Sequence, residues 1–386
     1  MLLDRVRLGW SNHRALNGHQ TYLSVSRLKL FEEDPWRFYL RYVRRMEEPP
    51  TLPLVFGGAM HAALEAYYAG EDPFARLEEE LRANIDRVED LSWRYALDDP
   101  SSASGKERVE TTPDEVLDFG RRVLRFALGY LPRIEGARVE VPLGELTDEY
   151  IEQELYDHRR RQTRRMRVAL VAGLPFHGYV DLITDEFIVD HKFVTHAVSY
   201  YGDRRFPPSY DAAEDMQLDV YAAASGYRRA GFNLITLRPQ PVGPDGLVWP
   251  TWIPASRWKG EGCPMVMVRS RDHSLIFVWR ERDPEESLRR LRSKLARLVS
   301  ELTASFLLLE DRVVPEVAFP PGDPVLLHRA RCPFCPLLCK FRFQTADDPR
   351  SQRFRLERRR ALRERPYIME EVEYVRKAIA GDPACT

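Results

Sequence analysis

Two short apolar runs on either side of a polar turn, between residues 178 and 192, have the pattern of a β-hairpin. Residues 180–183 and 187–189 are rich in β-branched and aromatic side chains, as central strands are, and the polar residues 184–186 supply the turn between them. We expect this hairpin to lie at the centre of a sheet, with the rest of the chain organised around it.

Three ionisable side chains, Asp181, Asp190 and Lys192, lie within or beside the apolar runs of this hairpin. A buried carboxylate without a cationic partner costs several kcal/mol, so two converging aspartates next to a lysine favour a hard divalent metal. Asp190 and Lys192 are two positions apart on one strand and therefore point to the same face. A carboxylate that holds a metal and an ammonium that holds a water beside it suit the hydrolysis of a phosphodiester.

The hairpin also has a purely structural interpretation, because short acidic spacings arise often by chance. Asp181 and Asp185 can be turn residues, and Asp190 and Lys192 can form an exposed ion pair. The hairpin alone leaves both interpretations open.

The pattern before the hairpin predicts helices and then the start of a sheet. A hydroxyl-capped helix runs from residue 24 to residue 45, with Pro35 as a point of interruption, and a second helix spans 57–68. Residues 71–135 are expected to be a helical insertion, with a polar break at 98–105 and a further helix from about 113 to 130. Residues 138–145 begin the sheet, and 167–173 continue it.

The pattern after the hairpin predicts a helix, a second hairpin and two more helices. The first helix spans residues 211–230, capped by Asp211 and stopped by Gly231. Strands at 264–269 and 274–279 add to the sheet. An amphipathic helix follows at 285–309, and a charged terminal helix at about 367–379.

Composition describes a soluble globular protein without a global basic field. The 386 residues are 30% charged and 44% hydrophobic, with a formal net charge of −1. No apolar run approaches the roughly 20 residues of a membrane span, and the first residues lack the regions of a signal peptide, so the expected location is cytoplasmic and no membrane partner is expected. Five cysteines, three of them between residues 332 and 339, argue against a disulfide scaffold.

The densest basic run of the chain lies at residues 158–165 and contains Arg159, Arg160, Arg161, Arg164 and Arg165. A charge run is usually a solvated loop. One that projects from a sheet carrying a metal site is also suited to track the phosphates of DNA.

Two helices carry further candidate residues in pairs four positions apart: His61 with Glu65, and Gln217 with Tyr221. Taken alone, each pair is better explained as ordinary structure, with a satisfied histidine, a solvated glutamate and two half-buried polar positions.

Four short motifs follow one another between residues 56 and 221: Gly57 to His61 with Glu65, Gly178-x-x-Asp181, Asp190-x-Lys192, and Gln217-x-x-x-Tyr221. Their order and spacing resemble the RecB-type branch of the PD-(D/E)XK nuclease superfamily. Residues 24–28 and 34–39, together with Cys332-Pro-Phe-Cys335, extend the resemblance over most of the chain.

The resemblance implies a role for each matching residue. His61, Asp181 and Asp190 would bind Mg²⁺ or Mn²⁺, with the backbone carbonyl of His191 as a further ligand. Lys192 would position and help to deprotonate the attacking water. Gln217 and Tyr221 would orient Lys192 and the scissile phosphate, and Glu65 and Glu140 are candidates to support the ligands or to bind a second metal.

The iron-sulfur members of the branch, which include AddB-type subunits and CRISPR adaptation nucleases, hold a 4Fe-4S cluster with one early cysteine and three late ones. Cys332, Cys335 and Cys339 match the late cysteines, although the last spacing is shorter than usual. The early position is Asp34 in this chain. Asp34 or His328 would complete the set, and zinc or an unused relic are the alternatives.

The expected fold class is α/β: a mixed central β-sheet flanked by helices, like a restriction endonuclease core, with terminal segments that meet at the cysteine cluster. The expected divisions are an N-terminal arm and helix at 1–50, the nuclease core at 51–310, and a C-terminal cysteine-cluster segment and tail at 311–386.

The resemblance implies the function of a DNA exonuclease on single-stranded or frayed ends, with a helicase or recombination protein as partner. A non-cleaving clamp subunit is the alternative, and the complete set of catalytic residues argues against it. A sequence-specific restriction enzyme is less favoured, because no separate target-recognition domain is evident.

Overall fold

The computed structural model describes residues 2–6, 22–46, 50–93, 109–157, 162–194, 200–201, 204–205, 215–237, 265–269, 273–321 and 349–382. The chain forms two compact units. Unit 1 comprises Met1–Glu48, Pro142–Gly178 and Glu285–Thr386, and unit 2 comprises Pro49–Val141 and Tyr179–Pro284. Three of the regions expected to carry chemistry lie outside the described residues: Arg159 to Arg161, His328, and the three clustered cysteines.

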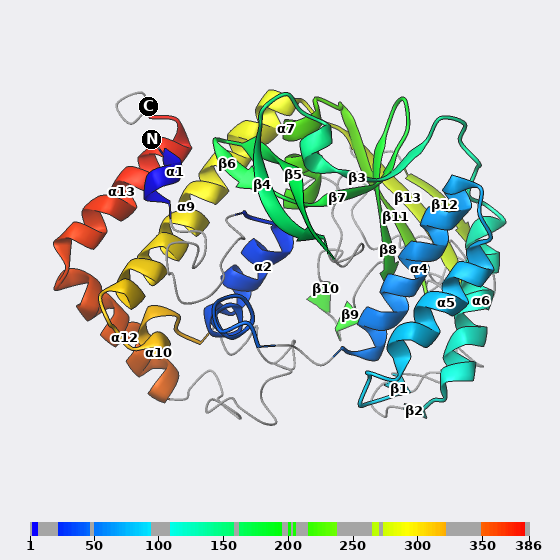
Figure 1. Ribbon diagram of the computed structural model, residues 1–386, viewed down its shortest axis with the longest axis horizontal. Coiled ribbons are helices and arrows are strands. Elements are labelled where there is room, and N and C mark those ends of the chain that lie inside the picture. Colours follow the sequence, from blue (N-terminus) through cyan, green and yellow to red (C-terminus); the bar gives the residue numbers. More distant parts are fainter. Residues whose placement is uncertain are drawn as a thin grey trace. The chain divides into compact units, whose positions relative to one another are not determined.

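Unit 2 is built on a six-stranded mixed sheet with the order β12-β13-β11-β8-β7-β3 (Figure 1). Strand β8 pairs in parallel with β11, while β7 with β8, β11 with β13, and β12 with β13 are antiparallel. The hairpin formed by β7 and β8 therefore lies inside the sheet, as expected. The strands are β3 (Arg138–Pro142), β7 (Tyr179–Ile183), β8 (Ile188–Val194), β11 (Arg229–Thr236), β12 (Met265–Arg269) and β13 (Ser274–Glu281).

Helix α7 (Met216–Ser225) crosses over between the parallel strands β8 and β11, as such a pair requires. The Asp215 side chain caps its first turn, and Gly226 ends it with a left-handed φ of 73°. Glycine adopts that conformation without a Cβ penalty. The prediction that this helix continues to residue 230 is wrong, because Ala230 and Gly231 belong to the buried strand β11.

Three helices, α4 (Leu52–Ala69), α5 (Pro73–Ile85) and α6 (Pro113–Leu128), pack side by side in unit 2 (Figure 1). Phe56 and Phe119 lie at the centre of their shared apolar core, which Ile235 of β11 and Leu275 of β13 join. The expected helical insertion also contains a small antiparallel pair, β1 (Ser92–Trp93) with β2 (Val109–Glu110), which the sequence pattern did not predict.

Unit 1 contains a separate three-stranded sheet of β4 (Tyr150–Asp157), β5 (Gln162–Val171) and β6 (Leu174–Phe176). The prediction that residues 167–173 extend the sheet begun at residue 138 is therefore wrong. Local hairpin pairing accounts for the difference, since Ala172 and Gly173 both adopt a positive φ and fold β6 directly back on β5. The predicted loop at 158–165 is also shorter than expected, because Gln162 begins β5.

The N-terminal helices of unit 1 are α1 (Leu2–Arg5), α2 (Val25–Glu33), α3 (Pro35–Phe38) and a π-helical turn at Tyr39–Val43. The predicted interruption at Pro35 is confirmed. The C-terminal helices are α9 (Pro284–Glu310), α10 (Pro315–Ala318), α12 (Pro349–Arg363) and α13 (Pro366–Ala380). Helix α9 and helix α13 confirm the two helices predicted there, whereas α12 was not predicted.

Aromatic rings join the N-terminal and C-terminal segments within unit 1. Phe31, Phe38 and Tyr39 contact Phe319, which also packs edge-on against Phe306 of α9. The two terminal segments are thus in contact within the described residues, whereas the cysteine cluster at which they were expected to meet lies outside them. None of the described helices is both long and apolar enough to cross a membrane.

Candidate functional site

The strands of the central hairpin separate where the ionisable residues begin. The ladder between β7 and β8 pairs Ile183 with Ile188 and Leu182 with Val189. One position further on, Asp181 Oδ2 accepts a hydrogen bond from the backbone N–H of His191 at 2.7 Å. A carboxylate thus takes the place of a backbone acceptor, which fixes Asp181 and satisfies a backbone donor of β8.

Three potential ligands converge on this point from three elements: His61 of α4, Glu140 of β3 and Asp181 of β7. One ligand atom from each lies within 4.8 Å of the others, and each residue is half-buried. His61 Nδ1 is 3.4 Å from Asp181 Oδ2. Nitrogen and carboxylate oxygen donors at this spacing fit a small divalent cation such as Mg²⁺ or Mn²⁺.

Glu140 enters this group through an unusual backbone conformation. Its φ is 49°, in the left-handed region that residues with a side chain rarely adopt, although it lies within strand β3. Such a conformation costs of order 1–3 kcal/mol and persists only where the surroundings impose it. The strain is therefore located at a residue whose carboxylate faces His61 and Asp181.

The electrostatics of Asp181 also favour a bound cation. Burial, and then the negative charge of Asp190, raise the pKa of the Asp181 carboxyl well above its usual range. Lys192 and the hydrogen bond from His191 act in the opposite direction without cancelling the rise. A cation between these carboxylates would remove their repulsion, so the residues present fit a divalent metal.

Asp190 and Lys192 form a second group on β8. Asp190 is 1% exposed, and its Oδ2 pairs with Lys192 Nζ. The two side chains share one face of the strand, as predicted, and the alternative of an exposed ion pair is wrong. Asp190 does not belong to the ligand group of His61, Glu140 and Asp181, although the sequence resemblance includes it among the metal ligands.

Gln217 and Tyr221 of α7 hold Asp190 from the other side. Gln217 Nε2 donates to Asp190 Oδ1 at 2.6 Å and lies 2.6 Å from the Tyr221 hydroxyl. That hydroxyl donates to the backbone carbonyl of Tyr179 at 2.9 Å. The two side chains therefore fix the carboxylate that pairs with Lys192.

His191 lies between Asp190 and Lys192 but points its ring into the core. It is 2% exposed, its Nδ1 lies 3.1 Å from Asn233 Nδ2, and its ring stacks on Tyr68. Burial, and then the neighbouring His61 and Lys192, lower the pKa of His191 to about 3. The ring is thus a neutral core group, and only the backbone of His191 faces Asp181.

A buried ion pair anchors α7 itself. Asp219, which lies two positions from both Gln217 and Tyr221, pairs with Arg282 just after β13, and both residues are at most 5% exposed. Sequence reasoning missed this pair because its members are 63 positions apart. The acidic residue on the otherwise apolar side of α7 was the available signal.

The remaining predicted site residues lie elsewhere in the described structure. Glu65 is on α4, where its charge acts on Arg76. Arg164 and Arg165 lie on β5, and Arg165 pairs with Glu152 across the β4–β5 ladder.

Asp34 is buried and caps α3 by accepting hydrogen bonds from the backbone N–H groups of Trp36 and Arg37. This cap accounts for Asp34 without a metal, and its role as a cluster ligand stays a prediction.

Comparison with known proteins identifies the family. No curated protein and no solved structure matches the chain. The family model of the PD-(D/E)XK nuclease superfamily matches residues 22–337, which is most of the chain and includes every element of the site. Together with the mixed sheet and the acidic hairpin at its centre, this match shows that the chain belongs to the PD-(D/E)XK nuclease superfamily.

Proposed function

We propose that this chain is a cytoplasmic deoxyribonuclease that hydrolyses phosphodiester bonds with Mg²⁺ or Mn²⁺ and acts as an exonuclease on single-stranded or frayed ends. The superfamily to which it belongs consists of metal-dependent nucleases. The observation that supports the proposal best is the convergence of His61, Glu140 and Asp181 beside the Asp190–Lys192 pair.

In this proposal the metal would be held by His61, Glu140 and Asp181, with Asp190 and the His191 carbonyl as further candidates. A bound divalent cation supplies charge that polarises the phosphoryl oxygen and favours deprotonation of water near neutral pH. Lys192 Nζ holds the attacking water and faces the negative charge that develops on the phosphoryl oxygens. Water adds to phosphorus and releases a proton to solvent while the bond to the leaving oxygen breaks, and a proton from solvent neutralises that oxygen.

Gln217, Tyr221 and Asp190 act as positioning groups in this mechanism. Their hydrogen bonds restrict the carboxylate that faces Lys192, so the ammonium is directed before substrate binds. Such prior placement is a main source of rate acceleration when the chemistry itself needs few groups.

The proposal is tested by incubating end-labelled single-stranded, double-stranded and circular DNA with Mn²⁺ and either the wild type or Asp181→Asn. Loss of cleavage in the variant, with products that shorten from one end, is the expected result. Cutting of circular DNA, which has no ends, would show that the chain is an endonuclease and not an exonuclease. Absence of cleavage with DNA binding retained would instead favour a clamp subunit that serves a helicase or recombination partner.

A 4Fe-4S cluster on Cys332, Cys335 and Cys339 is part of the same proposal, with zinc as the alternative. Iron and sulfide content and visible absorbance of the wild type and Cys335→Ser would test it. Tightly bound zinc in a colourless wild type would exclude iron-sulfur.

A further inference from the structure

Helix α12 and the two residues that follow it concentrate positive charge in a nearly neutral protein. Residues 349–365 contain eight arginines, two glutamates and no lysine, which gives a local charge of +6, whereas the whole chain has a formal charge of −1. The segment lies beyond residue 337, where the match to the nuclease superfamily ends. The catalytic assignment therefore does not account for it.

Two of these arginines fix the segment within unit 1. Arg358 is 8% exposed and bonds to the Ala318 carbonyl and to Glu301. Arg365 pairs with Asp311 at the end of α9. The helix is thus held with a defined face toward solvent.

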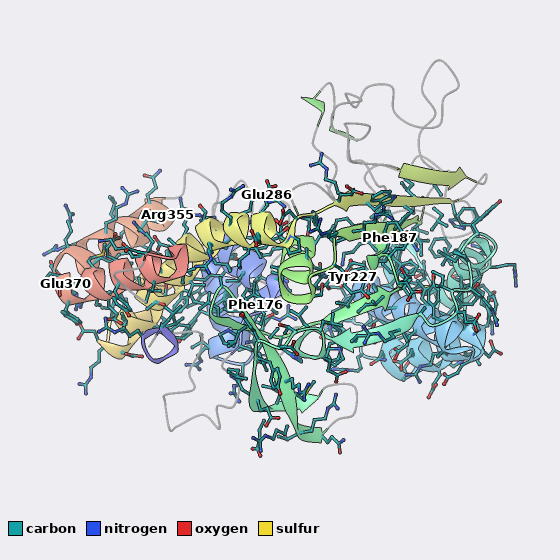
Figure 2. All side chains as sticks on the ribbon, turned by 90° about the horizontal axis from the view of Figure 1, so that it is seen from above. Phe176, Phe187, Tyr227, Glu286, Arg355 and Glu370 are labelled. Atoms are coloured by element: carbon teal, nitrogen blue, oxygen red, sulfur yellow. The ribbon has the colours of Figure 1, made fainter. Side chains whose placement is uncertain are left out.

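The exposed face of α12 carries two rows of side chains with different electrostatics. The first row is neutralised internally, because Arg353 pairs with Glu357 and Arg360 pairs with Glu364, each at 2.7 Å. The second row consists of Arg355, Arg359 and Arg363, which follow one another at intervals of four residues and include no acidic residue. Figure 2 marks Arg355 on this helix.

The second row contains guanidiniums that no acidic side chain neutralises. Arg355 Nη2 lies 3.5 Å from the Pro321 carbonyl, whereas Arg359 and Arg363 are exposed and have no hydrogen-bond or ion-pair partner among the residues that the structure describes. Arg363 also borders a groove between α12 and α13 that contains Glu370 and Glu373, neither of which forms an ion pair with it. Glu373 is already paired with Arg376 and Lys377.

We propose that this row, Arg355, Arg359 and Arg363, binds the phosphate backbone of the nucleic acid that the chain acts on. The side chains are spaced about 6 Å apart along the helix axis, a step comparable to that between successive phosphates of one strand. The exclusive use of arginine matches this partner, because the planar guanidinium binds phosphate in a bidentate manner. The proposal rests on the proposed function only for the identity of the nucleic acid as DNA.

The two rows supply their own control. Arg359→Gln/Arg363→Gln and Arg353→Gln/Arg360→Gln remove the same formal charge from the same helix, but only the first pair removes free guanidiniums. Binding of the full-length protein to a fluorescein-labelled single-stranded oligonucleotide is measured by anisotropy in EDTA, between 50 and 200 mM salt. EDTA makes this readout independent of cleavage.

The first variant is expected to bind more weakly, and the slope of log affinity against log salt should fall by about 1–2, since each phosphate contact contributes about 0.7–0.9. The second variant should keep the wild-type slope. Equal slopes in both variants would overturn the proposal, as would wild-type binding in both. Weaker binding in the first variant without any cleavage by the wild type would sustain the proposal and remove the nuclease function. An acidic protein as the true partner would appear as unchanged oligonucleotide binding in the first variant.

Discussion

Gln217 donates a hydrogen bond to Asp190 Oδ1 at 2.6 Å, which links helix α7 to the central strand β8. The other oxygen of the same carboxylate pairs with Lys192. Asp190 is therefore held at both oxygens before any ligand arrives. The orientation of Lys192 depends on a side chain that need not touch the substrate.

Gln217→Met should lower kcat by about 10–100-fold, the usual effect of losing a partner that orients a site carboxylate. KM for DNA should change little, because the glutamine acts on Asp190. Steady-state cleavage of a labelled oligonucleotide measures both constants. Ser225→Ala, at the other end of α7, is the control and should leave kcat and KM unchanged. A matching fall in kcat in that variant would mean that cleavage is sensitive to any substitution in α7.

Lys192→Gln should retain DNA binding and Mn²⁺ binding but lose cleavage by about 100-fold or more, because an amide cannot supply the positive charge that stabilises the transition state. Glutamine is preferred to alanine, since it still offers a donor to the buried Asp190 carboxylate. Single-turnover cleavage and calorimetric Mn²⁺ titration separate the two effects. Turnover at the wild-type rate would remove Lys192 from the mechanism.

Glu140→Asn should stabilise the metal-free protein and weaken its binding of Mn²⁺. Asparagine tolerates a left-handed backbone better than glutamate, so the metal-free variant should be more stable by about 0.5–1 kcal/mol, while its Mn²⁺ affinity falls. Arg312→Asn is the matched control, since Arg312 also has a positive φ, 60°, but lies outside the ligand group. We expect both variants to be more stable than the wild type and only Glu140→Asn to lose Mn²⁺ affinity. Destabilisation of Glu140→Asn would show that the conformation of Glu140 is not strained.

His191 should make the stability of the fold depend on pH. The pKa of the folded-state imidazole is about 3, against 6.5 in the unfolded chain. Below pH 6.5 the unfolded chain binds a proton at His191 that the folded chain does not bind, so the free energy of unfolding falls as the pH falls. The stability that the neutral His191 contributes is fully present above pH 6.5, the pKa in the unfolded chain. It is lost as the pH falls from 6.5 toward 3, at up to about 1.4 kcal/mol per pH unit.

His191→Phe tests this contribution, because phenylalanine can still stack on Tyr68 and does not titrate. Urea unfolding at pH 6.5 and pH 4.5 should show a smaller loss of stability in the variant than in the wild type. An identical pH dependence of the two proteins would assign the loss to other groups.

The sequence predicted the parts of the site that depend on local periodicity. The apolar runs on either side of the polar turn at 184–186 identified the hairpin. The two-residue spacing placed Lys192 with Asp190, and the four-residue spacing placed Gln217 with Tyr221. These relations follow from strand and helix geometry alone.

Other parts of the site depend on tertiary structure and could not be predicted. Nothing in the sequence around Glu140 indicates a left-handed backbone, since the surroundings impose it. Gly226 and Gly231 are equally good helix terminators by composition, and only the pairing of β11 with β8 and β13 decides between them. The Asp219–Arg282 pair joins residues too far apart in the chain for any periodic pattern.

The interleaving of the two units has a consequence for biosynthesis. The chain passes between units after Glu48, Val141, Gly178 and Pro284. Unit 2 therefore has all of its residues once synthesis reaches Pro284, whereas unit 1 needs Glu285–Thr386 as well. The earlier segments of unit 1, which contain Phe31 and Phe38, emerge from the ribosome long before the C-terminal segment that packs on them. The nascent chain therefore carries exposed aromatic surface until that segment, about the last hundred residues, is being made. We therefore expect chaperone dependence to arise from unit 1 rather than from unit 2, which carries His61, Glu140 and Asp181.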